Sequence, residues 1–140
     1  MWPFLLFNYL YYFPITTYYI VKNEENEKQM KYSEALKKNK DFQYVYKNGK
    51  SYANRYLVMY VLKNGMEKNR IGISVSKKVG NSVVRHHLTR LIRESYRILE
   101  ANFQVGYDIV VIARVSSKDK GYHDIKSALD HLGKLHDIYN

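Results

Sequence analysis

The stretch RIGISVSKKVGNSVVRHHLTRLIRESYR, residues 70–97, decides the fold because it holds a strand, a break and a long helix in succession. Residues 70–76 alternate apolar and polar side chains, which predicts a β-strand. A Gly-Asn pair then interrupts the pattern, and Asn81 or the serine after it can cap a following helix. Within residues 82–101 apolar side chains recur every three or four positions, which predicts an amphipathic helix. The quoted stretch holds seven Lys or Arg residues and one acid, Glu94.

The charge of the whole chain follows the same trend. The 140 residues fit one domain and carry a formal charge of +10, with a sequence pI near 9.6. Residues 30–140 alone carry +11, which indicates a polyanionic partner such as RNA, DNA or anionic lipid. The chain has no cysteine, which excludes disulfides, thiolate nucleophiles and cysteine zinc sites and agrees with a cytoplasmic location.

Residues 1–29 differ from the rest of the chain. Residues 1–21 are uncharged and aromatic, and residues 22–29 form a polar run that reads as a linker. We favour the interpretation that Met30 is the biological start and that residues 1–29 are an upstream extension of the reading frame. A weak membrane anchor through residues 1–21 and an aromatic arm that binds a partner are the alternatives.

The remaining segments predict a mixed α+β domain over residues 30–140. A helix begins at Asn39, which can cap it, and ends at Gly49. Further elements are one bent strand or two strands over 51–62, a hairpin turn over 63–65, a buried strand over 107–114 and a helix over 122–139. In that last helix Ile125, Leu129, Leu132 and Leu135 are expected to face inward. The predicted order is α-β-β-β-α-β-α, a sandwich of helices on a mostly antiparallel sheet.

The helix over residues 82–101 is expected to present a basic ridge. Arg85, Thr89, Arg93 and Arg97 repeat every four residues on the side opposite the apolar stripe, with His86 and Arg90 on the flank of that ridge. Guanidinium groups at this spacing suit phosphate oxygens and stacked bases. A solvated basic face is the alternative.

Two adjacent histidines, His86 and His87, interrupt this ridge. Neighbouring helical residues point about 100° apart, so the pair does not suit one metal ion, and no nucleophile stands at a motif position beside it. We expect His86 to border the basic face and His87 to flank the apolar stripe.

A second candidate surface combines aromatic and apolar side chains. Phe42 and Tyr46 on the first helix, with Tyr56, Val58 and Tyr60 on one side of a strand, could line a common concave surface. Such a platform stacks single-stranded bases at about 1–3 kcal/mol per base. Ordinary core packing is the alternative for these residues, and it stays open most evenly for Phe42.

The chain resembles the protein subunit of bacterial ribonuclease P over about residues 37–134. The matching pieces, in order, are LKKNKDFQYVYKNGKSYANRYLVMY, RIGISVSKKVGNSVVR, RLIRESY, DIVVIAR and ALDHL. The resemblance implies the α-β-β-β-α-β-α sandwich with a left-handed β-α-β crossover. It also implies a helper of a catalytic RNA that removes the 5′ leader from precursor tRNA. In that system the RNA does the chemistry with Mg²⁺, so the protein is expected to hold no catalytic residue, no metal and no tightly bound cofactor.

Positions matching the family motifs supply the expected site residues. For the precursor-tRNA leader these are Phe42, Tyr46, Val58 and Tyr60. For the catalytic RNA they are Ser76, Lys77, Lys78, Arg85, His86, Arg90 and Arg93. The sequence departs from the family motif on the helix, because His86, His87 and Thr89 stand where the family usually has Asn, Arg and Lys.

Two alternatives remain from the sequence alone. A general basic RNA-binding module, such as a ribosomal protein, would bind RNA without preferring a 5′ leader. A protein-only hydrolase would need carboxylates or histidines at metal-ligand spacing, and the sequence displays no such motif.

Overall fold

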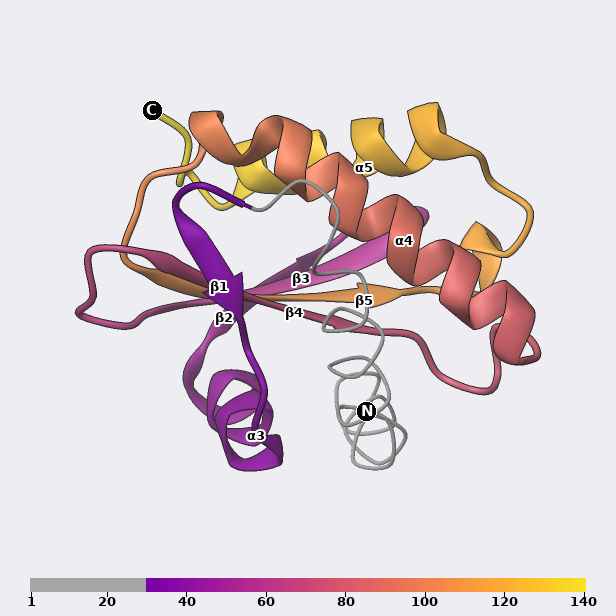
Figure 1. The fold of residues 1–140 in the computed structure, drawn as a ribbon, viewed down its shortest axis with the longest axis horizontal. Coiled ribbons are helices and arrows are strands. Elements are labelled where there is room, and N and C mark those ends of the chain that lie inside the picture. Colours follow the sequence, from indigo (N-terminus) through magenta and orange to yellow (C-terminus); the bar gives the residue numbers. More distant parts are fainter. Residues whose placement is uncertain (1–29) are drawn as a thin grey trace.

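The structure, a computed structural model, describes residues 30–140, so the predictions for residues 1–29 lie outside the described residues. Its centre is a five-stranded sheet in the order β1-β4-β5-β3-β2 (Figure 1). The strands are β1 (Ser33–Ala35), β2 (Lys50–Ala53), β3 (Leu57–Lys63), β4 (Asn69–Ser74) and β5 (Tyr107–Ala113). The helices are α3 (Asn39–Asn48), α4 (Ser82–Leu99) and α5 (Tyr122–Leu135), with short 3₁₀ turns at Glu100–Asn102 and Val115–Ser117.

The α+β class is confirmed, as is the predicted order of helices and strands from α3 onward, but the sheet is mixed. Strands β1 and β4 pair in parallel, as do β4 and β5, whereas β3 pairs antiparallel with both β5 and β2. The prediction of a mostly antiparallel sheet is therefore wrong. Strand β1 was also missed, because its three residues are too few to show an alternating pattern.

The turn after β3 is not the hairpin that the sequence predicted. Gly65 adopts a positive φ of 71°, and Oδ1 of Asn64 accepts a hydrogen bond from the Met66 backbone at 2.8 Å, so the local turn chemistry is present. However, β5 lies between β3 and β4 in the sheet. The crossover through α4 returns the chain so that β5 takes this central place, parallel to β4.

The central place of β5 explains why its sequence is apolar at consecutive positions. Ile109 and Val111 point to the core that the sheet shares with α4 and α5. Val110 and Ile112 point to a second, smaller core under α3. Figure 1 shows the resulting three layers, with α3 on one face of the sheet and α4 and α5 on the other. A strand covered on both faces needs apolar residues at every position rather than at alternate ones.

The helix ends agree with the predictions only in part. Asn81 caps α4, since its Oδ1 accepts a hydrogen bond from the Val84 backbone at 3.0 Å. Asn39, predicted as a cap, is instead the first residue of α3 after Lys38. The last helix stops at Leu135, four residues earlier than predicted, and Leu135 is 41% exposed rather than inward-facing. Within the described part of the chain, none of the helices combines the length and apolar character needed to span a bilayer.

Candidate nucleic-acid interface

The four residues predicted to contact a leader come together between α3 and the sheet. Phe42 and Tyr46 lie one helical turn apart on α3, and Val58 and Tyr60 point to the same face of β3 because strand side chains alternate. The ring centroids of Tyr46 and Tyr60 are 5.0 Å apart in an edge-to-face contact, and those of Phe42 and Tyr46 are 6.3 Å apart. All four belong to, or pack against, the core cluster under α3.

Burial separates these four residues. Phe42, Val58 and Tyr60 are at most 4% exposed, whereas Tyr46 is only partly buried. Phe42 reaches the sheet because Gly72 has no side chain, since a Cβ there would lie 2.6 Å from the Phe42 ring. In this structure Phe42 and Val58 are core residues, and the ring of Tyr46 is the member of the group that extends to the surface.

The two tyrosines of this cluster are neutral hydrogen-bonding groups. Burial raises the pKa of Tyr46 well above its ordinary value, and the neighbouring Tyr60 raises it further. Burial also raises the pKa of Tyr60, although a hydrogen bond with Ser51 opposes part of that effect. Both phenols therefore keep their protons at neutral pH, and the Tyr46 hydroxyl oxygen is itself buried.

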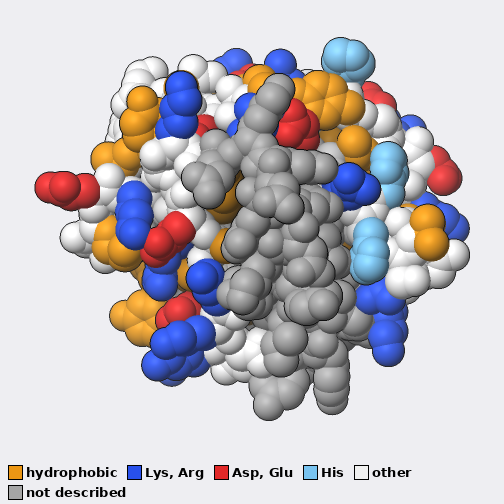
Figure 2. Space-filling model, in the orientation of Figure 1, with side chains coloured by type: hydrophobic (Ala, Val, Ile, Leu, Met, Phe, Trp, Pro, Cys, Tyr) orange, Lys and Arg blue, Asp and Glu red, His pale blue; other side chains and the backbone are white. Residues whose placement is uncertain are grey.

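A second set of predicted residues gathers where β4 and β5 end. The parallel strands β4 and β5 end side by side, and the antiparallel strand β3 begins next to the end of β5. One end of the sheet, here called the carboxyl end, therefore carries the loop after β4, the loop before β3 and the segment after β5. The loop after β4 carries the exposed Lys77 and Lys78, while Ser76 is buried and accepts a hydrogen bond from the Val79 backbone at 3.1 Å. Figure 2 shows histidine, Lys and Arg side chains on the right-hand side, where α4 begins in Figure 1.

Helix α4 presents a different face from the one predicted. His86, His87 and Arg90 are exposed, whereas Thr89 is 2% and Arg93 is 8% exposed. The expectation of a continuous exposed ridge through positions 85, 89, 93 and 97 is therefore wrong. His87 is exposed and lies one helical turn from Leu91, which packs against the core. The apolar stripe of α4 is buried as predicted. How far the buried side of the helix extends beyond that stripe depends on tertiary packing, which the sequence does not reveal. The exposed surface thus centres on Arg90 between the two histidines, with Arg85 partly buried at its side.

In the second half of α4, a glutamate partly neutralises the positive charge. Arg97 donates two hydrogen bonds to the Glu94 carboxylate, at 2.9 Å and 2.5 Å. This pair, three residues apart on the helix, offsets the charge of Arg97. The cationic surface is therefore strongest over the first half of α4 and the loop that precedes it. Within residues 30–140, no three His, Asp or Glu side chains group closely enough to hold a metal ion.

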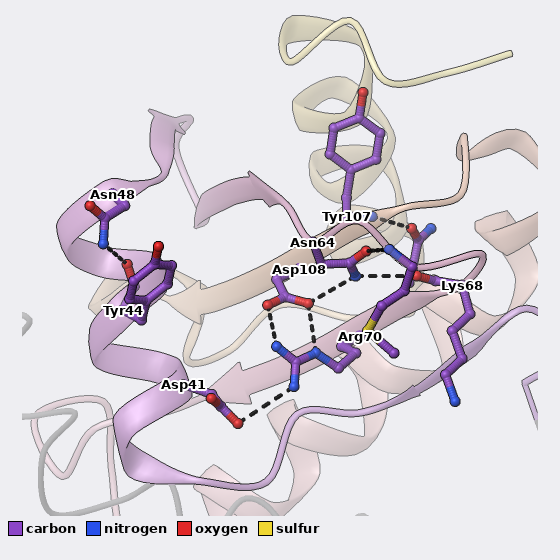
Figure 3. Close-up of polar contacts among 10 residues, drawn as sticks. Asp41, Tyr44, Asn48, Asn64, Lys68, Arg70, Tyr107 and Asp108 are labelled. Carbon is purple, nitrogen blue, oxygen red and sulfur yellow. Dashed lines mark hydrogen bonds and ion pairs between the residues drawn. The ribbon is translucent and has the colours of Figure 1, made fainter.

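A polar cluster at the opposite end of the sheet was not foreseen from the sequence. Arg70 donates to both carboxylate oxygens of Asp108, at 2.8 Å and 2.6 Å, and also lies 3.5 Å from Asp41 of α3 (Figure 3). The Asn64 side-chain amide donates to Asp108 at 3.0 Å. Residues Arg70 and Asp108 face each other across the parallel β4–β5 pair, so the cluster ties both strands to the start of α3. A lone acid at the start of an apolar run was the only signal in the sequence.

The chain is similar to known proteins over nearly all of the described residues. The family described as Ribonuclease P matches residues 30–136. The ribonuclease P protein component of Lachnoclostridium phytofermentans is 63% identical over 106 residues, covering 76% of this chain and 91% of that relative. The ribonuclease P protein of Staphylococcus aureus has a similar structure, with a TM-score of 0.70, 42% identity, and coverage of 76% of this chain and 97% of that one. The Thermotoga maritima protein aligns with a TM-score of 0.66 and 33% identity, covering 71% of this chain and 96% of that one.

Proposed function

The chain belongs to the bacterial ribonuclease P protein family, and on that premise we propose that it binds both the catalytic RNA and the 5′ leader of precursor tRNA. Membership of this family makes the chain a protein component of the ribonuclease P holoenzyme, which acts in tRNA processing. The general RNA-binding alternative, such as a ribosomal protein, receives no support from these relatives. The role implies action in the cytoplasm.

The carboxyl end of the sheet is the proposed surface for the catalytic RNA. The observation that carries this proposal is the convergence of exposed Lys77, Lys78, His86 and Arg90 there, without an acidic residue in the first turn of α4. Lysine and arginine neutralise phosphates and release counterions, which makes binding strong and salt-dependent. The buried Ser76, the partly buried Arg85 and the buried Arg93 would support this surface from beneath.

The cluster under α3 is the proposed surface for the leader. Tyr46 supports this proposal because its ring is partly exposed beside Tyr60, and an aromatic ring can stack on a base. Phe42 and Val58 would set the position of α3 against the sheet rather than contact a base directly. The two surfaces lie in different regions, so one protein could hold the leader and the catalytic RNA together.

The chemistry in this proposal belongs to the RNA subunit. Mg²⁺ acting with that RNA would supply the hydrolytic step, and the protein would contribute binding and orientation without a catalytic residue of its own. Positioning of the leader increases the fraction of precursor that is bound in a productive arrangement.

The test is cleavage of a precursor tRNA at low Mg²⁺ by the ribonuclease P RNA of the same cell, with and without the full chain. We expect strong stimulation by the protein and no cleavage by the protein alone. Cleavage without RNA, or no stimulation by a folded protein, would overturn the proposal.

Matched variants separate the two surfaces. Lys77→Gln should reduce the slope of log binding constant against log salt for the catalytic RNA by about 1. Lys63→Gln is the control, because Lys63 is exposed at the opposite end of the sheet. Tyr46→Ala should weaken the binding of precursor tRNA more than that of mature tRNA. Equal losses for both tRNAs would remove Tyr46 from the leader surface.

A further inference from the structure

A shallow pocket of about 250 Å³ lies between the loop before β3 and residues 124–131 of α5. Its lining combines amide, imidazole, hydroxyl, carboxylate and guanidinium groups, from Asn54, Arg55, Tyr56, Asp124, Ser127 and His131. It is on the face of the sheet opposite α3, so it is separate from the proposed leader surface. Its volume is sufficient for a nucleobase, and its polar lining suits a ligand with hydrogen-bonding edges.

The wall of this pocket is rigid because Asn54 is held on every side. Its Oδ1 accepts hydrogen bonds from the backbones of Tyr56 and Leu57, at 3.2 Å and 3.0 Å. Its Nδ2 donates to the Ala128 carbonyl at 2.8 Å, which links the loop to α5. A pocket that is already formed loses little conformational entropy when a ligand binds.

His131 is oriented by the same amide. The Asn54 Nδ2 lies 3.3 Å from His131 Nδ1, and an amide nitrogen can only donate, so Nδ1 must accept. The neutral imidazole then has its proton on Nε2, which is available as a donor because the side chain is exposed. Together with the Ser127 hydroxyl and the Asp124 carboxylate, the pocket offers both donors and an acceptor to the edge of a base.

Arg55 lines the pocket, and a second cation, Lys120, lies close to the lining residue Tyr56. The Arg55 guanidinium carbon and the Lys120 ammonium nitrogen each lie 5.6 Å from the ring centroid of Tyr56. The ring holds these cations near the pocket through cation–π attraction. An arginine and a lysine at one rim suit a phosphate, which the single carboxylate of Asp124 would repel, so the phosphate belongs at the rim and the base inside.

The pocket lies at the same end of the sheet as the cationic surface. The loop that contains Asn54 and Arg55 precedes β3, whose first residue pairs with Ala113 at the end of β5. The pocket is therefore at the carboxyl end, where the loop after β4 also lies, and α4 and α5 both begin on that side of Figure 1. An RNA bound across Lys77, Lys78 and Arg90 could extend to it.

We propose that this pocket binds one unpaired nucleotide of RNA, with its phosphate at Arg55 and Lys120 and its base edge against His131, Ser127 and Asp124. Since Asp124 accepts hydrogen bonds, bases with an exocyclic amine are preferred over uracil. The nucleotide belongs to the catalytic RNA, and this assignment of its source, unlike the site itself, rests on the proposed function.

The first test is a titration of the full chain with AMP, followed by backbone amide NMR shifts. We expect saturable shifts around Ser127 and His131 with a Kd of about 1 mM, and weaker binding of UMP. His131→Ala and Arg55→Gln should each weaken AMP binding about tenfold, whereas Lys63→Gln should not change it. Unchanged shifts elsewhere in the spectrum will show that each variant is folded.

Three results would overturn the proposal. These are no saturable shift with AMP at about 10 mM, equal affinity in the parent and the pocket variants, and inorganic phosphate binding as tightly as AMP. The last result would make the rim an anion site without a base pocket.

The source of the nucleotide is tested in the holoenzyme. Arg55→Gln and His131→Ala should weaken binding of the catalytic RNA and leave the affinity of the holoenzyme for precursor tRNA unchanged. The opposite pattern would refute the catalytic RNA as the source. Since the AMP titration needs no other RNA, failure of the pocket and failure of the proposed function are distinguishable.

Discussion

Replacing Asp108 by Asn should destabilise the protein by about 2–3 kcal/mol, although the two side chains have nearly the same shape. The Asp108 side chain is 5% exposed and accepts two hydrogen bonds from Arg70 and one from Asn64. In Asp108→Asn an amide NH₂ replaces one carboxylate oxygen, and because Arg70 donates to both oxygens, one Arg70 N–H would face another donor in either orientation of the amide. Hydrogen bonds to charged groups contribute about 1.5–3 kcal/mol, and loss of one partner from a buried pair costs about 3–5 kcal/mol. The Arg70 side chain is 25% exposed, so water recovers part of that cost.

The matched control is Glu34→Gln. Glu34 pairs with Lys68 at 2.6 Å, the same N–O distance as the shorter Arg70–Asp108 contact, but these side chains are 44% and 46% exposed. Exposed pairs contribute about 0–1 kcal/mol, so Glu34→Gln should change the free energy of unfolding by about 0.5 kcal/mol or less. The two variants differ mainly in how far the pair is removed from water.

Urea unfolding of the parent protein and both variants measures the difference. With an m-value of about 1–3 kcal/mol/M, Asp108→Asn should lower the midpoint by about 1 M, and the Glu34→Gln midpoint should hardly move. High salt should abolish the small effect of Glu34→Gln and leave that of Asp108→Asn. Equal losses for the two variants, or a loss below about 1 kcal/mol for Asp108→Asn, would refute the argument from burial.

Three further predictions concern other parts of the chain. Gly72→Ala should cost about 1–3 kcal/mol in urea unfolding because its Cβ would meet the Phe42 ring at 2.6 Å, and adding Phe42→Leu should recover part of that loss. Burial lowers the pKa of His136 from its ordinary value of 6.5, despite an opposing hydrogen bond to the Met59 carbonyl. The unfolded chain therefore binds the proton more readily, so stability should fall as the pH drops below about 6.5, and His136→Gln should reduce that pH dependence. His87→Arg at pH 8 should strengthen RNA binding and steepen its salt dependence by up to about 1, because position 87 is exposed; an unchanged slope would place it outside the RNA contact.

Local sequence patterns predicted the helices and most strands because those patterns act over a few residues. The three-to-four-residue spacing of Leu88, Ile92 and Leu99 is sufficient to define the buried side of α4. The cap at Asn81 is equally local, since its partner is three residues away. The family motifs also identified the cationic loop and the aromatic cluster, and the structure brings the members of each together.

Contacts between distant residues could not be predicted in this way. The sequence shows the turn at Asn64, but not that the strand formed 44 residues later enters the sheet beside β3. Exposure of His87 and burial of Thr89 depend on packing around α4.

The sequence by itself determined the α+β class, the helical phase of α4 and the excess positive charge, because periodicity, capping and composition are properties of short segments or of sums over residues. Only the tertiary structure decided the place of β5 between β3 and β4, the pairing of Arg70 with Asp108, and the pocket between Asn54 and His131. Each of these brings together residues at least 38 positions apart in the chain. Such contacts form where strand pairing and burial of both faces of the sheet are satisfied together, which no short segment can encode.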